Sequence, residues 1–103
     1  MALQVVQMGD NSPVSEEDLI FLINMLDQSD REEFAEEFVE DLETMLSKSG
    51  LYKILSGRIH LSNTKILQIV ESNDRARKWL ANKIREKMKE AERILAKMEA
   101  EMK

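Results

Sequence analysis

The apolar residues of this chain recur at intervals of three and four over most of its length, which is the spacing of one face of an α-helix. Short polar segments that contain Gly, Ser, Asn or Asp separate the periodic stretches, and such residues favour turns and helix caps. We expect helices over 15–27, 30–48, 51–55, 63–71 and 75–103. The pattern predicts an all-α fold, a compact bundle of four to five helices with a long, coiled-coil-like C-terminal helix.

Capping signals support the predicted helix ends. Ser15 with Asp18 three residues later has the form of a capping box, and Ser29 with Glu32 repeats it. Gly50 follows the second apolar stretch, and glycine is a common residue at a helix C-terminus. We therefore expect the second helix to begin near residue 30 and to stop by Gly50.

The segment 30–48 is strongly amphipathic. Its apolar face carries Phe34, Phe38, Leu42, Met45 and Leu46, and its polar face carries Glu33, Glu36, Glu37, Glu40 and Asp41. The first set fits the core side of a helix, and the second set fits a solvated acidic side. Carboxylate metal sites in helix bundles also use histidines, which this segment lacks, so we expect neither a metal nor a cofactor.

The last predicted helix carries a heptad seam along one side. Its members are Ile84, Met88, Ala91, Leu95, Met98 and Met102. At about 1.5 Å per residue, this helix is longer than a domain of this size needs, so we expect the seam to form a homodimer interface. Trp79 falls on another side of the helix, where we expect it to anchor the helix to the core.

Charge leaves the orientation of such a dimer open. A parallel pair would bring Lys87 toward Glu92, whereas an antiparallel pair would bring Arg85 toward Glu99. The alternative is that the helix folds back on the earlier helices and that no dimer forms.

The charged residues divide the chain into two halves. Residues 1–47 hold thirteen acidic side chains and a single basic one, Arg31, whereas residues 48–103 hold fourteen bases and seven acids. This asymmetry favours a polyanion as partner of the basic half, and the acidic face of 30–48 is the alternative docking surface, for a basic protein. A further interpretation is that the two halves neutralise each other in the fold.

A chain of 103 residues fits one domain. We divide it into a loose N-terminal arm over 1–13, a helical core over 14–74 and a long dimerisation helix over 75–103. The chain has no Cys, no basic flank of a signal peptide and no apolar run of the roughly 20 residues that span a membrane. We expect a soluble, cytoplasmic protein without membrane contact. With no Gly-rich phosphate loop and a single histidine, His60, it is not expected to be an enzyme.

A stretch in the middle of the chain reads Leu51-Tyr52-Lys53-Ile54-Leu55-Ser56-Gly57-Arg58, followed by Leu61-Ser62 and by Ile66-Leu67-Gln68-Ile69. It resembles the recognition-helix half of the lambda-repressor-type helix-turn-helix family over about a quarter of the chain. Leu61 stands where that family usually has proline, and the segment before the turn is acidic. The core over 14–74 thus includes a stretch similar to a helix-turn-helix.

The resemblance implies a small, non-enzymatic DNA-binding protein, a dimeric transcriptional regulator. Base edges would be contacted by Lys48, Ser49, Tyr52 and Lys53, and phosphates by Arg58, His60, Asn63 and Lys65. Two alternatives involve no nucleic acid: an acidic adaptor or inhibitor that binds a basic protein, and a coiled-coil scaffold. The short helix 51–55 would then be only a packing turn.

Overall fold

The computed structural model describes residues 14–102, and every regular element in that part of the chain is a helix. In chain order the helices are α1 (Glu16–Ile23), α2 (Gln28–Glu37), α3 (Val39–Glu43), α4 (Lys48–Leu55), α5 (Asn63–Ser72) and α6 (Asp74–Glu101). The predicted all-α class and long C-terminal helix are confirmed, with six helices in the described residues instead of four to five. The arm predicted over 1–13 lies outside those residues.

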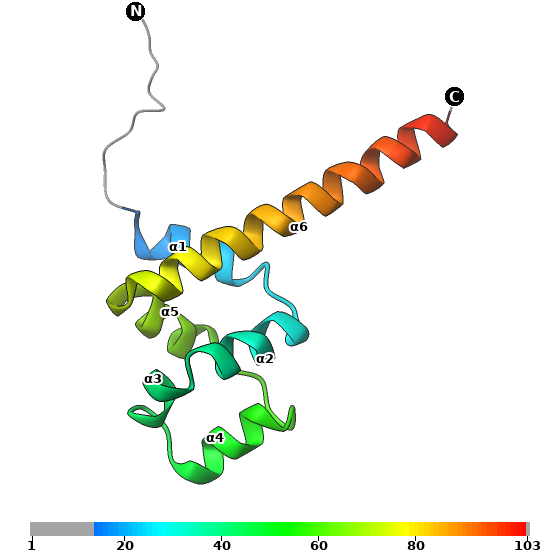
Figure 1. Cartoon of the computed structure of the whole chain (residues 1–103). Helices are drawn as coiled ribbons and strands as arrows, with labels where there is room; N and C mark the ends of the chain where they lie inside the picture. Colours follow the sequence, from blue (N-terminus) through cyan, green and yellow to red (C-terminus); the bar gives the residue numbers. More distant parts are fainter. Residues whose placement is uncertain (1–13, 103) are drawn as a thin grey trace, which may run out of the picture.

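The first half of α6 packs on α1 and α5, and the second half projects away from the other helices (Figure 1). α5 packs against both α1 and α6, while α2 packs against α3 and α4. α4 therefore lies at the end of the molecule opposite α6. We refer to residues 14–87 as the head and to residues 88–102 as the projecting segment.

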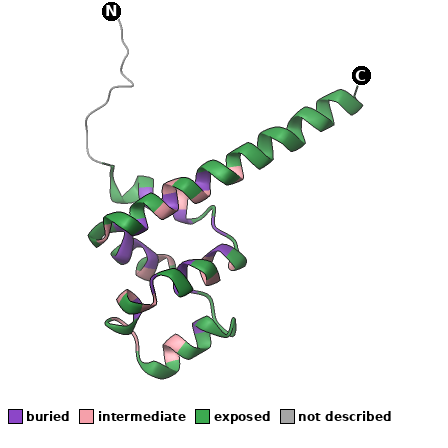
Figure 2. Ribbon diagram, in the orientation of Figure 1, coloured by how far each residue is buried: buried purple, intermediate pink, exposed green. Residues whose placement is uncertain are grey.

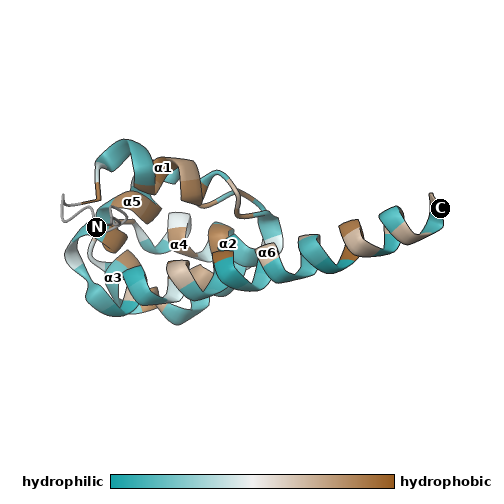
Figure 3. Cartoon of the chain, turned by 90° about the horizontal axis from the view of Figure 1, so that it is seen from above, coloured by the Kyte–Doolittle hydropathy of each residue, from teal (hydrophilic) through white to brown (hydrophobic). Residues whose placement is uncertain are grey.

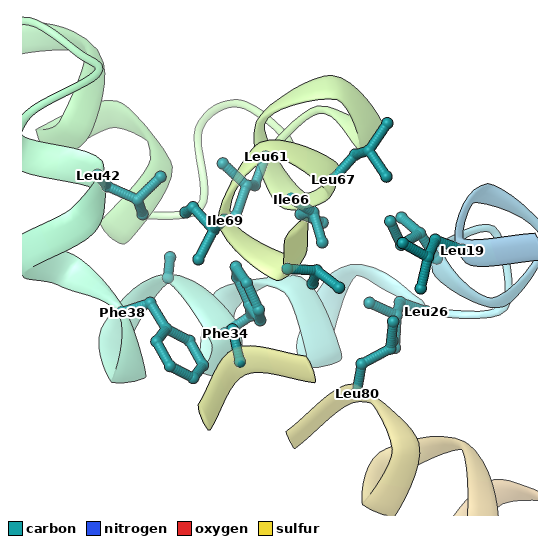
Figure 4. Packing of buried hydrophobic residues seen from close by; sticks show 14 of the residues in the cluster. Leu19, Leu26, Phe34, Phe38, Leu42, Leu61, Ile66, Leu67, Ile69 and Leu80 are labelled. Atoms are coloured by element: carbon teal, nitrogen blue, oxygen red, sulfur yellow. The ribbon is translucent and has the colours of Figure 1, made fainter. Parts of the chain in front are cut away.

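One apolar core holds the head together. Its most deeply buried large side chains are Ile23, Phe34, Phe38, Leu42, Leu61, Ile66, Ile69, Val70 and Leu80. Figure 4 shows side chains of α2, α5 and α6 converging around Phe34. Phe34, Phe38 and Leu42 recur every four residues, so successive turns present their side chains to the same core.

Serine caps set the starts of α1 and α4. Ser15 Oγ accepts a hydrogen bond from the backbone N–H of Asp18 at 3.1 Å, and the Asp18 carboxylate accepts one from the Ser15 N–H at 3.3 Å, which confirms the predicted capping box. Ser47 Oγ accepts from the N–H of Gly50 at 3.1 Å. Gly50 thus lies in the first turn of a helix, and the prediction that it ends the preceding helix is wrong. A side-chain cap at Ser47 satisfies a backbone N–H that the first turn leaves free.

The capping box predicted at Ser29 and Glu32 is also wrong. The box of α2 is formed by Asp27 and Asp30, whose carboxylates accept each other's backbone N–H at 2.8 and 3.0 Å. Both carboxylates also lie within 4 Å of Lys87 of α6, at 3.4 and 2.6 Å. The box joins residues three positions apart, as at Ser15, and it starts the helix two residues earlier than predicted.

The helix predicted over 30–48 is divided at Phe38. This residue has φ −116° and ψ 36°, outside the helical range, and it separates α2 from α3. The Phe38 ring stays in the core, where it lies 4.7 Å from the ring of Phe34 between centroids. The predicted boundaries are therefore wrong, although the predicted apolar face is buried.

Candidate interaction surfaces

Arg31 of α2 holds the head together through hydrogen bonds to three backbone carbonyl oxygens. Its guanidinium donates to Leu26 O at 3.2 Å, to Leu61 O at 2.9 Å and to Ile23 O at 3.0 Å. It also donates to Asn63 Oδ1 at 2.8 Å. The end of α1 and the segment that leads into α5 are thus tied to α2. In the sequence, the only sign of this role is that Arg31 is the one base among thirteen acids.

Asn63 has a different role from the phosphate contact that the resemblance implies. Its Oδ1 accepts from Arg31, and its Nδ2 donates to Asn24 Oδ1 at 2.7 Å. Both polar ends of the side chain are therefore used inside the head. Lys65, two residues later, is half-buried.

The other six predicted DNA contacts are all exposed, and we call this set of residues the α4 surface. It consists of Lys48, Ser49, Tyr52, Lys53, Arg58 and His60. The first four lie on α4 and the last two in the loop that follows it. No ion pair of residues 14–102 includes any of the six. α3, whose Glu40 and Glu43 are exposed, packs against α4, so acidic side chains flank this basic surface.

Acids of α2 pair with bases of α6. Arg75 Nη1 lies 2.7 Å from Glu37 Oε2, and Lys83 Nζ lies 3.1 Å from Glu33 Oε1. The hydrogen bond to Glu33 raises the pKa of Lys83 against the opposing effect of burial. Part of the acidic face predicted for a basic partner is therefore covered by α6. The two oppositely charged halves of the chain are partly neutralised within the fold.

Lys87 continues this pairing at the boundary between the head and the projecting segment. Its Nζ lies 2.6 Å from Asp30 Oδ2 and 3.4 Å from Asp27 Oδ2. The hydrogen bond to Asp30, with the attraction of both carboxylates, raises the pKa of Lys87 above its usual 10.5. The hydrogen bond from the Asp30 backbone N–H, with the attraction of Lys87, lowers the pKa of Asp27 below 3.8. Lys87 is thus committed to the head.

Trp79 anchors α6 to the core, as the sequence predicts. Its ring meets Phe34 edge to face, with 5.2 Å between centroids and 72° between the planes. Lys83 Nζ lies 5.5 Å from the Trp79 ring, and the Arg75 guanidinium lies 4.6 Å from the ring of Phe38. Such cation–π contacts hold both bases against the core while their charges meet carboxylates of α2.

The projecting segment has no cover within the described chain. Every residue from Met88 to Met102 is exposed (Figure 2). The exposed fractions of its large apolar residues are 52% for Met88, 46% for Ile94, 55% for Leu95, 50% for Met98 and 81% for Met102. Figure 3 shows brown, hydrophobic bands between teal, hydrophilic ones along the projecting part of α6. The radius of gyration is 17.1 Å, against about 13 Å for a compact domain of this length.

Two residues change the predicted seam. Ile84 is only 5% exposed and belongs to the core of the head, so its predicted place in a dimer interface is wrong and the free seam begins at Met88. Ile94 stands outside the heptad positions, yet its side chain is exposed beside Leu95. The heptad spacing therefore does not predict that Ile94 belongs to the exposed apolar row.

Membrane spans, pockets and metal sites are absent from residues 14–102. No helix there is long and apolar enough to cross a membrane. That part of the chain also holds no pocket and no group of three or more His, Asp or Glu side chains placed as metal ligands would be.

Comparison with known proteins gives no relative for this arrangement. No protein-family model matches the chain, and neither does any curated protein or solved structure.

Proposed function

We propose that this chain is a non-enzymatic homodimeric interaction module, in which the projecting segment binds a second copy and the dimer presents two heads. The observation that carries the proposal is the row of exposed apolar side chains from Met88 to Met102. Apolar surface removed from water contributes roughly 25 cal/mol per Å². A single copy leaves this contribution unused, whereas a second copy offers a matching surface.

The lack of tertiary packing along the projecting segment also supports a partner. Most helix stability in proteins comes from packing of an amphipathic face. The projecting segment continues α6, and none of its residues is buried against the head. A second helix along its apolar row would supply the missing tertiary contacts.

The charges of the projecting segment favour a second copy over other occupants. Its acids are Glu90, Glu92, Glu99 and Glu101, and its bases are Lys89, Arg93 and Lys97. Helices that lie on membranes carry mainly Lys and Arg on the polar face, and a strongly charged partner would select a single opposite sign. Mixed charges suit a surface that pairs with itself.

A pair of neighbouring substitutions tests the proposal. Leu95→Asp places a charge in the apolar row, and Ala96→Asp places the same charge about 100° further around the helix. Both residues are exposed, so neither substitution disturbs the head. By analytical ultracentrifugation we expect Leu95→Asp to weaken the dimer at least about tenfold and Ala96→Asp to change it less than about twofold. Equal effects of the two would overturn the proposal.

DNA binding by the α4 surface is a second candidate function. It is favoured by the four outward residues of α4, Lys48, Ser49, Tyr52 and Lys53, which are exposed together at the end of the head opposite α6. It ranks second because Glu40 and Glu43 of the neighbouring α3 would repel phosphates. The two functions are compatible, since a dimer would carry two such surfaces.

A salt titration with random-sequence duplex DNA tests this second candidate. The logarithm of the binding constant should fall with the logarithm of salt concentration, with a slope of about −0.9 per phosphate contacted. Lys53→Ala should weaken binding, and Lys97→Ala, on the projecting segment, should leave it unchanged. Lack of binding at low salt would remove DNA and leave the dimeric module as the function.

A further inference from the structure

The head and the exposed apolar row use the same side of α6. Ala76, Leu80 and Ile84 of α6 are buried against the head. At about 100° per residue, the mean direction of the row from Met88 to Met102 lies within about 45° of the mean direction of these buried residues. A partner helix that covers the row must therefore lie in line with the head and end at its edge, level with Ile84 and Arg85.

This placement bears on how two copies can pair. In a parallel pair, residues 74–87 of one copy would run along the side of α6 on which α1 and α5 of the other copy pack. Two rigid heads cannot share that volume, because protein interiors are already close-packed. In an antiparallel pair, the heads lie at opposite ends and each projecting segment covers the other.

The ion pairs of the head lead to the same orientation. The favourable charge contact of a parallel pair joins Lys87 to Glu92 of the second copy. Lys87 is already bonded to Asp30 and Asp27, and its side chain is only 27% exposed. The contact of an antiparallel pair joins Arg85 to Glu99, and both of these residues are exposed. Arg85 bonds only the side-chain oxygen of Asn82 within the described chain, at 3.0 Å, so it remains free for a carboxylate.

We infer that the two copies pair antiparallel about a two-fold axis near residue 93, with Met88 against Met98 of the second copy and Ala91 against Leu95. This inference rests on the proposed dimer. The register puts Arg85 near Glu99 of the second copy at both ends, and it sets the two Ile94 side chains beside the axis. The surface is isologous, as in most homodimers, because each pair occurs twice.

Neighbouring registers are worse. A shift of one heptad toward the head would press the partner helix against α1 and α5, where Leu80 and Ile84 are buried. A shift of one heptad the other way would place Glu92 opposite Glu99, so that two like-charge pairs replace the two contacts of Arg85. The register centred near residue 93 keeps the apolar overlap and both contacts of Arg85, with a single like-charge pair, the two Glu92 side chains, at the axis.

Disulfide exchange tests the orientation in the full chain, which has no native cysteine. Met88→Cys, carrying a tag, is mixed with untagged Met98→Cys in a glutathione buffer, and the products are separated on a non-reducing gel. Both positions are about half exposed, at 52% and 50%, so the head is undisturbed. In the antiparallel register each cysteine faces a residue ten positions away in the sequence, so two copies of the same cysteine lie about 15 Å apart along the axis. A disulfide needs Cα atoms within about 7 Å, so two identical variants cannot form one within such a dimer.

The expected result is an excess of the mixed disulfide, which joins the Met88→Cys chain to the Met98→Cys chain, at least about threefold over either homodisulfide. Ala96→Cys, on the outer face, serves as the control and should form no disulfide above the random level. An excess of the Met98→Cys homodisulfide would show a parallel pair and overturn the inference while the dimer stands. If all disulfides formed at the random level and the wild-type chain had a monomeric mass, the proposed dimer would be overturned as well.

Discussion

Arg31 and Leu61, thirty positions apart, are joined by a 2.9 Å hydrogen bond from the guanidinium to the backbone carbonyl oxygen. Leu61 is buried, and so are Ile23 and Leu26, whose carbonyl oxygens accept from the same guanidinium. A buried carbonyl oxygen that loses its donor costs free energy, because water cannot replace the donor. Arg31 therefore couples the folding of α1, α2 and α5.

Replacing Arg31 by Met should lower the free energy of unfolding by about 2 to 3 kcal/mol, since it removes the side-chain donor of three backbone carbonyl oxygens. The measurement is urea unfolding followed by the fluorescence of Trp79, the only tryptophan. Arg58→Met is the matched control: Arg58 is exposed, and we expect a change within about 0.5 kcal/mol. Equal losses for the two variants would contradict the role given to Arg31.

Phe34→Ala should lower the free energy of unfolding by about 3 to 5 kcal/mol, because it empties a site packed between Phe38 and Trp79. Phe34 is 0% exposed, whereas Phe21 is 68% exposed. The same substitution at Phe21 should cost less than about 1 kcal/mol. A comparable cost at both positions, measured by urea unfolding, would mean that the core is misassigned.

Stability should depend on pH through the Asp27, Asp30 and Lys87 cluster. Because the pKa of Lys87 is raised above 10.5 in the folded state, its ion pairs contribute fully to stability below pH 10.5. This contribution is lost as the pH rises through the folded-state pKa. Because the pKa of Asp27 is lowered below 3.8 in the folded state, its interactions contribute to stability above pH 3.8. This contribution is lost as the pH falls through the folded-state pKa. The contribution of this cluster to stability should thus be largest between these limits.

Lys87→Gln tests the alkaline side. The difference in the free energy of unfolding between the wild-type chain and this variant should be constant at neutral pH and should shrink above pH 10.5. Urea unfolding at a series of pH values gives this difference. If it stayed constant well above pH 10.5, the ion pairs of Lys87 would not contribute.

Glu92→Gln should tighten the dimer about two- to fivefold, because the antiparallel register sets the two Glu92 side chains near each other at the axis. Glu99→Gln should instead weaken it by a similar factor, since Glu99 loses the charge that faces Arg85. Sedimentation equilibrium measures both. In a parallel pair Glu92 would face Lys87, so a weaker dimer for Glu92→Gln would argue against the antiparallel arrangement.

Local patterns predicted the parts of the fold that depend on neighbouring residues. The cap at Ser15 follows from a residue three positions away, and the burial of Phe34 and Leu42 follows from their spacing. Trp79 could be assigned to the core because it stands off the heptad positions. Whether DNA contacts the α4 surface stays a prediction.

Distant contacts explain what the sequence did not show. The carboxylates that cap α2 pair with Lys87, about sixty positions away, and the internal role of Asn63 depends on Arg31. Ile84 satisfies the heptad spacing as well as Met88 does, and only the position of the head decides that one is buried and the other free. Which of the two residues is buried can be seen only from the arrangement of the folded helices.

The molar mass of the wild-type chain in solution shows directly whether two copies associate. Static light scattering at increasing concentration, up to several hundred micromolar, should show the mass rising toward twice the 12.0 kDa of one chain. A mass that remains at 12.0 kDa over this whole range would contradict the claim that the projecting segment binds a second copy.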